Sequence, residues 1–290
     1  MTLTQIHRQA QKSAVVTDST AYIPKELRDR HHIHMIPLNV VFGEASYKEE
    51  IDMSWKDYYK EVKAHNNLPT TSQPAYGELI ALYEKLAESY DAVISIHLSS
   101  GISGTFNSAV SAGGMLENIK VYPYDSEISC MAQGFYAIEA AEMAEKGAAP
   151  EEILSHLDHM KTSMRAYFMV DDLSHLQRGG RLSGAQAFVG SLLKVKPILH
   201  FENKLIVPFE KIRTRKKALN RIYELLDEDA GKGKPLRVVV IHANREEEAE
   251  QIIEELSQQY PHAEFYKSYF GPVIGTHLGE GAMGIAWYLV

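Results

Sequence analysis

The stretch from Ala92 to Thr105 constrains the fold of this chain more than any other. Ala92 to Leu98 is a nearly continuous apolar run without a turn residue, which is typical of a strand buried on both faces of a parallel sheet. The run ends at Ser99-Ser100-Gly101-Ile102-Ser103-Gly104-Thr105, and apolar residues at helical spacing follow. A strand, a turn of hydroxyl residues and glycine, and a helix leave backbone N–H groups free over the C-terminal end of the strand.

The charge of this stretch indicates which ligand the turn could take. Between Ala92 and Ile119 there is no Lys or Arg, and Glu117 is the only acid. Because polyphosphate sites normally include a cation, neutral donors alone suggest a singly charged anion such as a carboxylate. The alternative is that the serines only cap the helix and bind no ligand.

Composition limits the class of protein. A chain of 290 residues is long enough for two domains, and its net charge of −8 argues against general nucleic-acid binding. Cys130 is the only cysteine, so no internal disulfide can form. Residues 1–12 lack the apolar core of a signal peptide, and no run approaches the roughly 20 apolar residues that span a membrane. We therefore expect a cytoplasmic protein.

Strands and helices alternate along the whole chain, which predicts an α/β fold with two α/β domains. Residues 13–162 are expected to form an N-terminal doubly wound parallel sheet, and residues 163–290 a C-terminal α/β domain. Ligands of such sheets bind outside the carboxyl ends of the strands. The turns expected to converge there are Asp18-Ser19-Thr20, Ser99-Ser100 and Asp125-Ser126.

The sequence also predicts the local structure of four shorter stretches. A single strand is expected over Met35–Phe42, a rigid loop over Pro69–Pro74 and a short helix around Phe188–Leu193. The stretch Gly271–Gly279 is glycine-rich, and we expect that backbone there approaches a ligand closely. His277 within it could donate to an anion, or could be a structural histidine.

A basic segment lies between Arg178 and Arg221. Its eleven basic residues and two acids give the segment a net charge of +9. The whole chain has a net charge of −8, so the rest of the chain carries −17. Such a reversal suggests docking to something anionic, and the alternative is a solvated helix face.

Several common motifs are absent or do not fit. Gly279–Gly284 matches the dinucleotide pattern G-x-G-x-x-G, but too few residues follow it for the required helix and strand. The sequence has no P-loop and no nucleophile elbow, so it shows no means of binding ATP or attacking an ester alone. His31, His32 and His34 lack a matching carboxylate pattern, and we expect no metal site there.

The motifs taken in order resemble the DegV family of bacterial fatty-acid-binding proteins. The resemblance covers nearly the whole chain from Ala14 and rests on these stretches: Val16–Thr20, Thr71–Pro74, Leu98–Thr105, Gly179–Ser183, Lys196–Leu199, Lys211–Thr214 and Gly271–His277.

The resemblance implies two α/β domains with one long-chain fatty acid in a tunnel between them, and no cofactor. It implies that Thr71 and Ser100 hydrogen-bond the carboxylate beside His277, with Thr70, Ser99 and Ser103 nearby. In this reading the chain is not an enzyme. A separate ATP-binding fatty-acid kinase phosphorylates the bound carboxylate, and the acyl-phosphate passes to phospholipid synthesis, with a membrane acyltransferase as a further partner. The expected kinase-docking residues are Arg213, Arg215 and Arg181.

Two other functions remain open from the sequence. One is a lipid-binding sensor or regulator that docks to a different protein. The other is a hydrolase or phosphotransferase that uses Ser100 and His277, although the absent P-loop and nucleophile elbow count against it.

Overall fold

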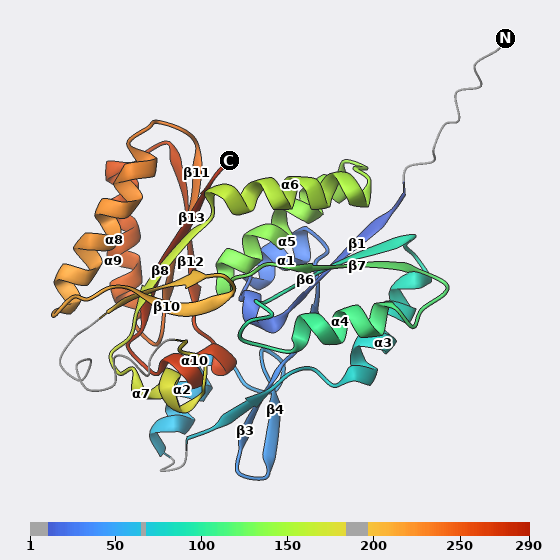
Figure 1. Cartoon of the computed structure of the whole chain (residues 1–290), viewed down its shortest axis with the longest axis horizontal. Coiled ribbons are helices and arrows are strands. Elements are labelled where there is room, and N and C mark those ends of the chain that lie inside the picture. The colour runs from blue at the N-terminus through green and yellow to red at the C-terminus, as the bar shows by residue number, and fades with distance from the viewer. Residues whose placement is uncertain (1–10, 65–67, 184–196) are drawn as a thin grey trace.

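The structure is a computed structural model that describes residues 11–64, 68–183 and 197–290. Two sheets lie on either side of a central helix, α5 (Cys130–Glu145), which contacts strands of both (Figure 1). Eleven residues of α5 are buried, on all of its faces, because it is covered from both sides. The expected α/β fold is confirmed.

The N-terminal sheet is parallel and has the strand order β2-β1-β6-β7. Its central strands β1 and β6 are buried along their whole length, as the apolar run from Ala92 predicts. The four strands are β1 (Ser13–Asp18), β2 (His34–Ile36), β6 (Ala92–His97) and β7 (Lys120–Asp125).

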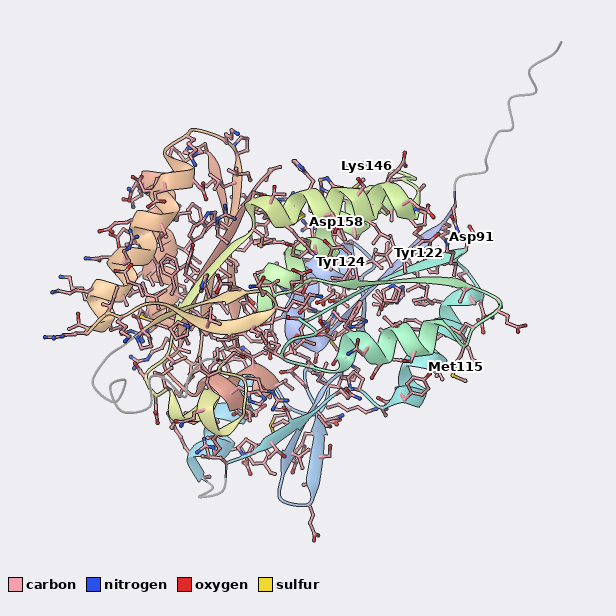
Figure 2. All side chains as sticks on the ribbon, viewed as in Figure 1. Asp91, Met115, Tyr122, Tyr124, Lys146 and Asp158 are labelled. Carbon is pink, nitrogen blue, oxygen red and sulfur yellow. The ribbon has the colours of Figure 1, made fainter. Side chains whose placement is uncertain are left out.

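Helices cover both faces of this sheet. One face packs on α3 (Tyr76–Ala87) and α4 (Thr105–Gly113), and the other on α5. Helix α6 (Pro150–Ser163) packs on α5, and the Tyr124 hydroxyl of β7 donates to Asp158 of α6 at 3.1 Å (Figure 2).

The single strand expected over Met35–Phe42 is wrong. The chain leaves the parallel sheet at Pro37, which cannot donate to a ladder, and β3 (Asn39–Phe42) joins a different sheet. That antiparallel sheet has the order β4-β3-β5, with β4 (Ala45–Lys48) and β5 (Thr70–Ser72). The loop expected over Pro69–Pro74 therefore contains a short strand, because Thr70 to Ser72 pair with β3.

The second sheet has the order β10-β9-β8-β13-β11-β12. Alternate residues of these strands face opposite cores, so that Phe168 and Ala286 face α5 while Met169 and Trp287 face the outer helices. The strands are β8 (Arg165–Met169), β9 (Ile198–Glu202), β10 (Leu205–Glu210), β11 (Leu236–His242), β12 (Ala263–Tyr269) and β13 (Met283–Leu289).

Two long helices, α8 (Arg215–Ala230) and α9 (Glu246–Gln259), cover the outer face of this sheet (Figure 1). Shorter helices lie at its lower end in the same view: α2 (Trp55–Ala64) comes from the N-terminal half, and α7 (Ser174–Arg178) and α10 (Pro272–Leu278) come from the C-terminal half. Helix α1 (Lys25–Arg30) lies nearer the centre of the view. The helix expected around Phe188–Leu193 lies outside the described residues.

The largest hydrophobic cluster draws residues from both halves of the chain, from Val15 to Tyr288. The boundary between residues 162 and 163 stays a prediction; the six-stranded sheet begins at Arg165. Within the described ranges, no helix is both long and apolar enough to cross a bilayer.

Candidate functional site

A cavity lies where the two sheets and α10 meet. It encloses about 920 Å³ of space that protein atoms do not fill, counting the solvent at its mouth. Its walls are mostly apolar and come from both halves of the chain, among them Leu38, Leu98, Ile102, Phe168, Phe201, Ile206, Ile241, Phe270, Val273, Ile274, Leu278 and Ala286.

Cys130 lines the same cavity at the start of α5. Burial raises the pKa of its thiol to about 12, so that the side chain stays neutral and acts as a small apolar group. Cys130 therefore adds to the apolar lining of the cavity.

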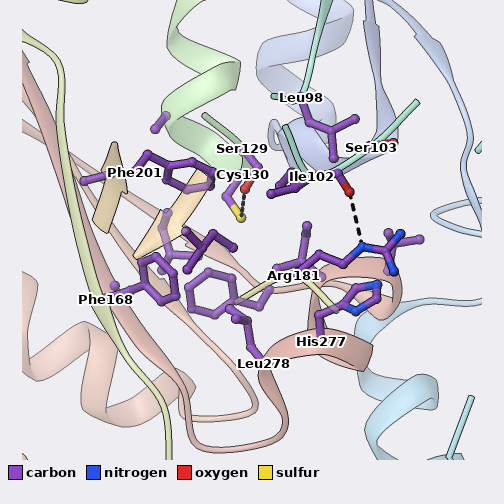
Figure 3. A pocket seen from close by; sticks show the side chains of 18 of the residues that line it. Leu98, Ile102, Ser103, Ser129, Cys130, Phe168, Arg181, Phe201, His277 and Leu278 are labelled. Atoms are coloured by element: carbon purple, nitrogen blue, oxygen red, sulfur yellow. Dashed lines mark hydrogen bonds between the residues drawn. The ribbon is translucent and has the colours of Figure 1, made fainter. Parts of the chain in front are cut away.

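One side of the cavity is polar. Thr71 of β5, Ser103 of the turn after β6, Arg181 after α7 and His277 of α10 all line it. In Figure 3, His277, Arg181 and Ser103 lie together, and Phe168 and Phe201 lie on the other side of the pocket. The cavity thus has a polar end and an apolar end.

Thr71 and His277 form the centre of the polar end. The Thr71 Oγ1 and His277 Nε2 atoms are 2.9 Å apart, and His277 Nδ1 is buried without a hydrogen-bond partner among the described residues. If Nε2–H donates to Thr71, the threonine hydroxyl hydrogen is free; if Thr71 donates to Nε2, the hydrogen on Nδ1 is free. In either tautomer the pair keeps one hydrogen for an acceptor.

His277 is held neutral by its surroundings. Burial, with the nearby charge of Arg181, lowers the pKa of His277 to about 4. Gly179 packs directly against the ring, since a Cβ atom at position 179 would lie 2.3 Å from Nδ1. The site therefore offers uncharged donors from Thr71 and His277 beside one permanent positive charge.

Arg181 belongs to this site by geometry. Its Nε donates to the carbonyl oxygen of Ile102 at 3.2 Å (Figure 3). Its Nη1 donates to the carbonyl oxygen of Gly179. The guanidinium thus bridges the turn after β6 and the end of α7. From the sequence we expect Arg181 at a docking surface and not at the cavity, because 78 positions separate it from Ser103 and local sequence does not show that the two meet.

The expected convergence of three turns is confirmed. The Asp18 carboxylate accepts from the Leu98 backbone N–H, and Asp125 accepts from the backbone N–H of Ser100. The Ser126 N–H donates to the His97 carbonyl oxygen. Carboxylates at the ends of β1 and β7 therefore hold the turn after β6 in place.

Ser99 and Ser100 are engaged within the protein. Ser100 Oγ donates to Asp125 Oδ2 at 2.5 Å, and Ser99 Oγ donates to the Lys204 carbonyl oxygen at 2.7 Å. Neither is among the cavity-lining residues, and the same holds for the exposed Thr70. Of the six expected carboxylate-site residues, the structure brings Thr71, Ser103 and His277 to one cavity; the roles of Ser100, Ser99 and Thr70 stay predictions.

A buried network of side-chain hydrogen bonds supports this turn, and the sequence did not predict it. His97 Nδ1 lies 3.0 Å from Asp18, and His97 Nε2 lies 2.8 Å from Ser95 Oγ, which is 2.7 Å from the Tyr83 hydroxyl. These side chains are fully buried. The apolar run around them masked the polar residues, although His97 and Ser95 at alternate strand positions must share one face.

The glycine-rich stretch Gly271–Gly279 contains helix α10. Its glycines approach protein side chains: a Cβ at Gly271 would meet the Tyr22 ring at 2.3 Å, and one at Gly275 would meet the Tyr59 hydroxyl at 2.7 Å. The expectation that they approach a ligand is therefore wrong for these two positions. They let α10 pack closely enough to bring His277 to the cavity.

The expected docking residues differ in their surroundings. Arg213 is exposed, whereas Arg215 is half-buried in an ion pair with Glu248 at 2.9 Å and also donates to the Gly281 carbonyl oxygen. Arg221 pairs with Glu210. Ion pairs with acidic residues therefore neutralise part of the charge of the basic segment. Lys194 and Lys196 of this segment lie outside the described part of the chain.

Among the described residues, no group of three or more His, Cys, Asp or Glu side chains could hold a metal ion. The polar end of the cavity instead combines hydroxyl, imidazole and guanidinium donors, which suit a carboxylate or a similar small anion.

Over the described residues, fold and site together define an α/β protein of three sheets, with an apolar cavity that is polar at one end. The sequence model of the DegV family matches residues 12–290. The chain belongs to the DegV family.

Named relatives are similar to this chain over nearly its whole length. The chain is 74% identical to Protein DegV of Bacillus subtilis over 275 residues, which cover 94% of this chain and 98% of the relative. It is 55% identical to a DegV domain-containing protein of Listeria innocua, covering 96% and 98%.

Solved structures show the same fold. A crystal structure of DegV, described as a fatty acid binding protein from Bacillus subtilis, matches with a TM-score of 0.93 at 72% identity, covering 97% of this chain and 100% of that one. A Thermus thermophilus DegV family protein, described by its fatty acid binding, matches with a TM-score of 0.87 at 30% identity, covering 96% and 100%.

Proposed function

We propose that this protein binds one long-chain fatty acid in the cavity and presents its carboxylate to a partner ATP-dependent fatty-acid kinase. The observation that carries the binding proposal is a single apolar cavity with hydroxyl, imidazole and guanidinium groups gathered at one end. Fatty acid binding by DegV proteins of Bacillus subtilis and Thermus thermophilus supports the same ligand class.

The two ends of the cavity contribute differently to binding. Burial of about 15 methylenes is worth roughly 12 kcal/mol before the costs of binding are subtracted. Hydrogen bonds to a charged group contribute about 1.5–3 kcal/mol each. The acyl chain therefore supplies most of the affinity, and Thr71 and His277 mainly fix where the carboxylate lies.

The geometry disfavours the alternative in which Ser100 attacks a substrate with His277 as its base. Such a pair needs a hydrogen bond between the two side chains. In the described structure Ser100 donates to Asp125, and His277 Nε2 interacts with Thr71. We therefore infer that the chain carries its ligand and that the chemistry is done by the kinase.

The kinase step is supported by chemistry at the polar end. The carboxylate loses negative charge as its oxygen bonds to phosphorus, but the incoming phosphoryl group brings additional negative charge to the polar end. An imidazole and a guanidinium there can stabilise that charge. The exposed Arg213 offers a contact for an acidic partner surface. The acyl-phosphate product would be consumed in phospholipid synthesis, with a membrane acyltransferase as the next partner.

Lipid extraction tests the proposal. The purified protein is denatured and extracted, and the acyl content is measured by mass spectrometry against the protein concentration. We expect about one fatty acid per chain, and acyl-phosphate only when an ATP-binding fatty-acid kinase and ATP are added. Extracts without a stoichiometric fatty acid, together with no uptake of added oleate by the stripped protein, would rule the carrier function out.

A further inference from the structure

Phe201 occupies a special position at the apolar end of the cavity. It lines both the cavity and a second hollow on the protein surface, whose lining also includes Ile128, Tyr136 and Met164. We propose that Phe201 is the end wall of the acyl cavity and sets the longest fatty acid that the protein accepts. This inference rests on the proposed function, because it concerns the specificity of the same site.

Strand alternation explains why Phe201 faces the cavity. On β9, Leu199 and Phe201 point to the face that packs toward α5, whereas Ile198 faces the outer helices. Phe201 pairs across the hairpin with Ile206, and its ring lies 6.3 Å from the Phe168 ring, centroid to centroid. Phe168 and Ile206 line the cavity too, so the three side chains together close its apolar end.

The hairpin that carries Phe201 is anchored at its tip. Its turn residues Asn203 and Lys204 both have positive φ, as a tight hairpin turn requires. The Lys204 carbonyl oxygen accepts from Ser99 Oγ, and Lys204 Nζ lies 3.0 Å from Asp125. The backbone beside Phe201 is thus fixed on the N-terminal half, and a longer ligand has to displace the ring.

The second hollow can take more of an acyl chain. It measures about 450 Å³ with its solvent included. Ile128, Tyr136 and Met164 give it apolar lining, and charged side chains such as Glu127 and Lys161 also line it. Removal of the Phe201 ring would join the two spaces, and further methylenes would then pack on Ile128 and Tyr136.

The consequence is a length limit that a single side chain controls. Each methylene that gains a buried position adds about fourfold to affinity, because burial is worth about 0.8 kcal/mol per methylene. A fatty acid two carbons beyond the limit should therefore gain about 15-fold in the variant Phe201→Ala relative to the wild-type protein.

The experiment measures which chain lengths each variant selects. Lipid-stripped protein is incubated with an equimolar mixture of saturated fatty acids from 12 to about 24 carbons, and the bound acids are quantified by mass spectrometry. Phe209→Ala is the matched control, because it removes the same atoms from the same hairpin but Phe209 lines neither the cavity nor the second hollow. Thermal melts check that each variant is folded.

We expect Phe201→Ala to raise the longest retained chain by at least two carbons, and Phe209→Ala to leave that limit in place. Phe201→Trp should lower the limit, and it decides the question if the alanine variant does not fold. Equal shifts in Phe201→Ala and Phe209→Ala, or no shift in any folded Phe201 variant, would overturn the inference. Failure of the wild-type protein to bind any acid would instead contradict the proposed function.

Discussion

Thr71 and His277 are 206 positions apart in the sequence, and their side chains meet with 2.9 Å between Oγ1 and Nε2. β5 supplies the threonine and α10 the histidine, so the pair joins the small antiparallel sheet to the C-terminal half. The relationship makes the polar end of the cavity depend on the packing of both halves.

Thr71→Val should weaken fatty acid binding without abolishing it. The substitution keeps the shape of the side chain but removes the hydroxyl that interacts with His277, and the loss of one hydrogen bond to a carboxylate costs about 1.5–3 kcal/mol. Displacement of a fluorescent fatty acid should report about a tenfold to hundredfold loss in affinity. Thr70→Val, at an exposed neighbouring position, is the control, and an equal loss there would contradict a specific role for Thr71.

His277→Ala should impair phosphorylation more than binding, because the phosphoryl group brings additional negative charge to the polar end only during transfer. Ser100→Ala should retain lipid less tightly than the wild-type protein, since either a carboxylate contact or the support of the turn by Asp125 is lost. Retained lipid and acyl-phosphate formation are measured for both variants. Complete loss of lipid in both, or unchanged phosphorylation in both, would show that the head group binds elsewhere.

Gly179→Ala should disturb His277 without touching the ligand directly. The added Cβ would lie 2.3 Å from Nδ1, so either the ring or the end of α7 has to move. We expect reduced acyl-phosphate formation and an altered His277 imidazole signal in NMR spectra. Gly77→Ala in α3 is the control because its Cβ would meet no atom within 4 Å; an identical NMR change in that variant would refute the specific effect.

Arg213→Glu should weaken coupling to the kinase and leave the lipid content unchanged. Arg213 is exposed in the basic segment, and reversal of its charge slows association with an acidic partner in a salt-dependent way. Phosphorylation is assayed at low protein concentration over a range of salt. Lys146→Glu carries the same charge change at the end of α5, far from α8 (Figure 2), and equal rates for the two variants would argue against docking at Arg213.

The lowered pKa of His277, about 4, predicts a pH dependence of stability in the lipid-free protein. An unfolded histidine takes up a proton near pH 6.5, whereas the folded one does so only near 4. The contribution of His277 to the free energy of unfolding is therefore fully present above pH 6.5. It is lost as the pH falls toward 4, by up to about 3 kcal/mol.

Comparison with His277→Asn isolates this contribution, because other buried groups also titrate. Burial raises the pKa of Glu49 to about 8. The contribution of Glu49 to the free energy of unfolding is therefore lost as the pH rises, which is the opposite of the dependence expected for His277. Urea unfolding between pH 4 and 7 should show a shallower fall toward acid pH in the variant than in the wild-type protein. Parallel curves would mean that His277 is not kept neutral by burial.

The sequence by itself determined those strands, turns and helices that a run of neighbouring residues specifies. The apolar run from Ala92 is β6, the hydroxyl turn follows it, and helix α4 starts at Thr105. Because a parallel sheet brings the carboxyl ends of its strands to one edge, the meeting of Asp18, Ser100 and Asp125 could also be expected. Pro37 was the signal that β2 and β3 are separate strands, and the apolar pattern around it concealed that break.

Tertiary structure alone decided which side chains face the cavity. The Ser100 hydroxyl is held by Asp125, whereas Arg181 reaches the polar end through bonds to carbonyl oxygens of Ile102 and Gly179. A hydrogen bond depends on distance and direction between groups from distant segments, and periodicity along the chain contains neither. For the same reason no local pattern in the sequence indicated Phe201, and the packing of the hairpin on Ser99 made it a wall between two hollows.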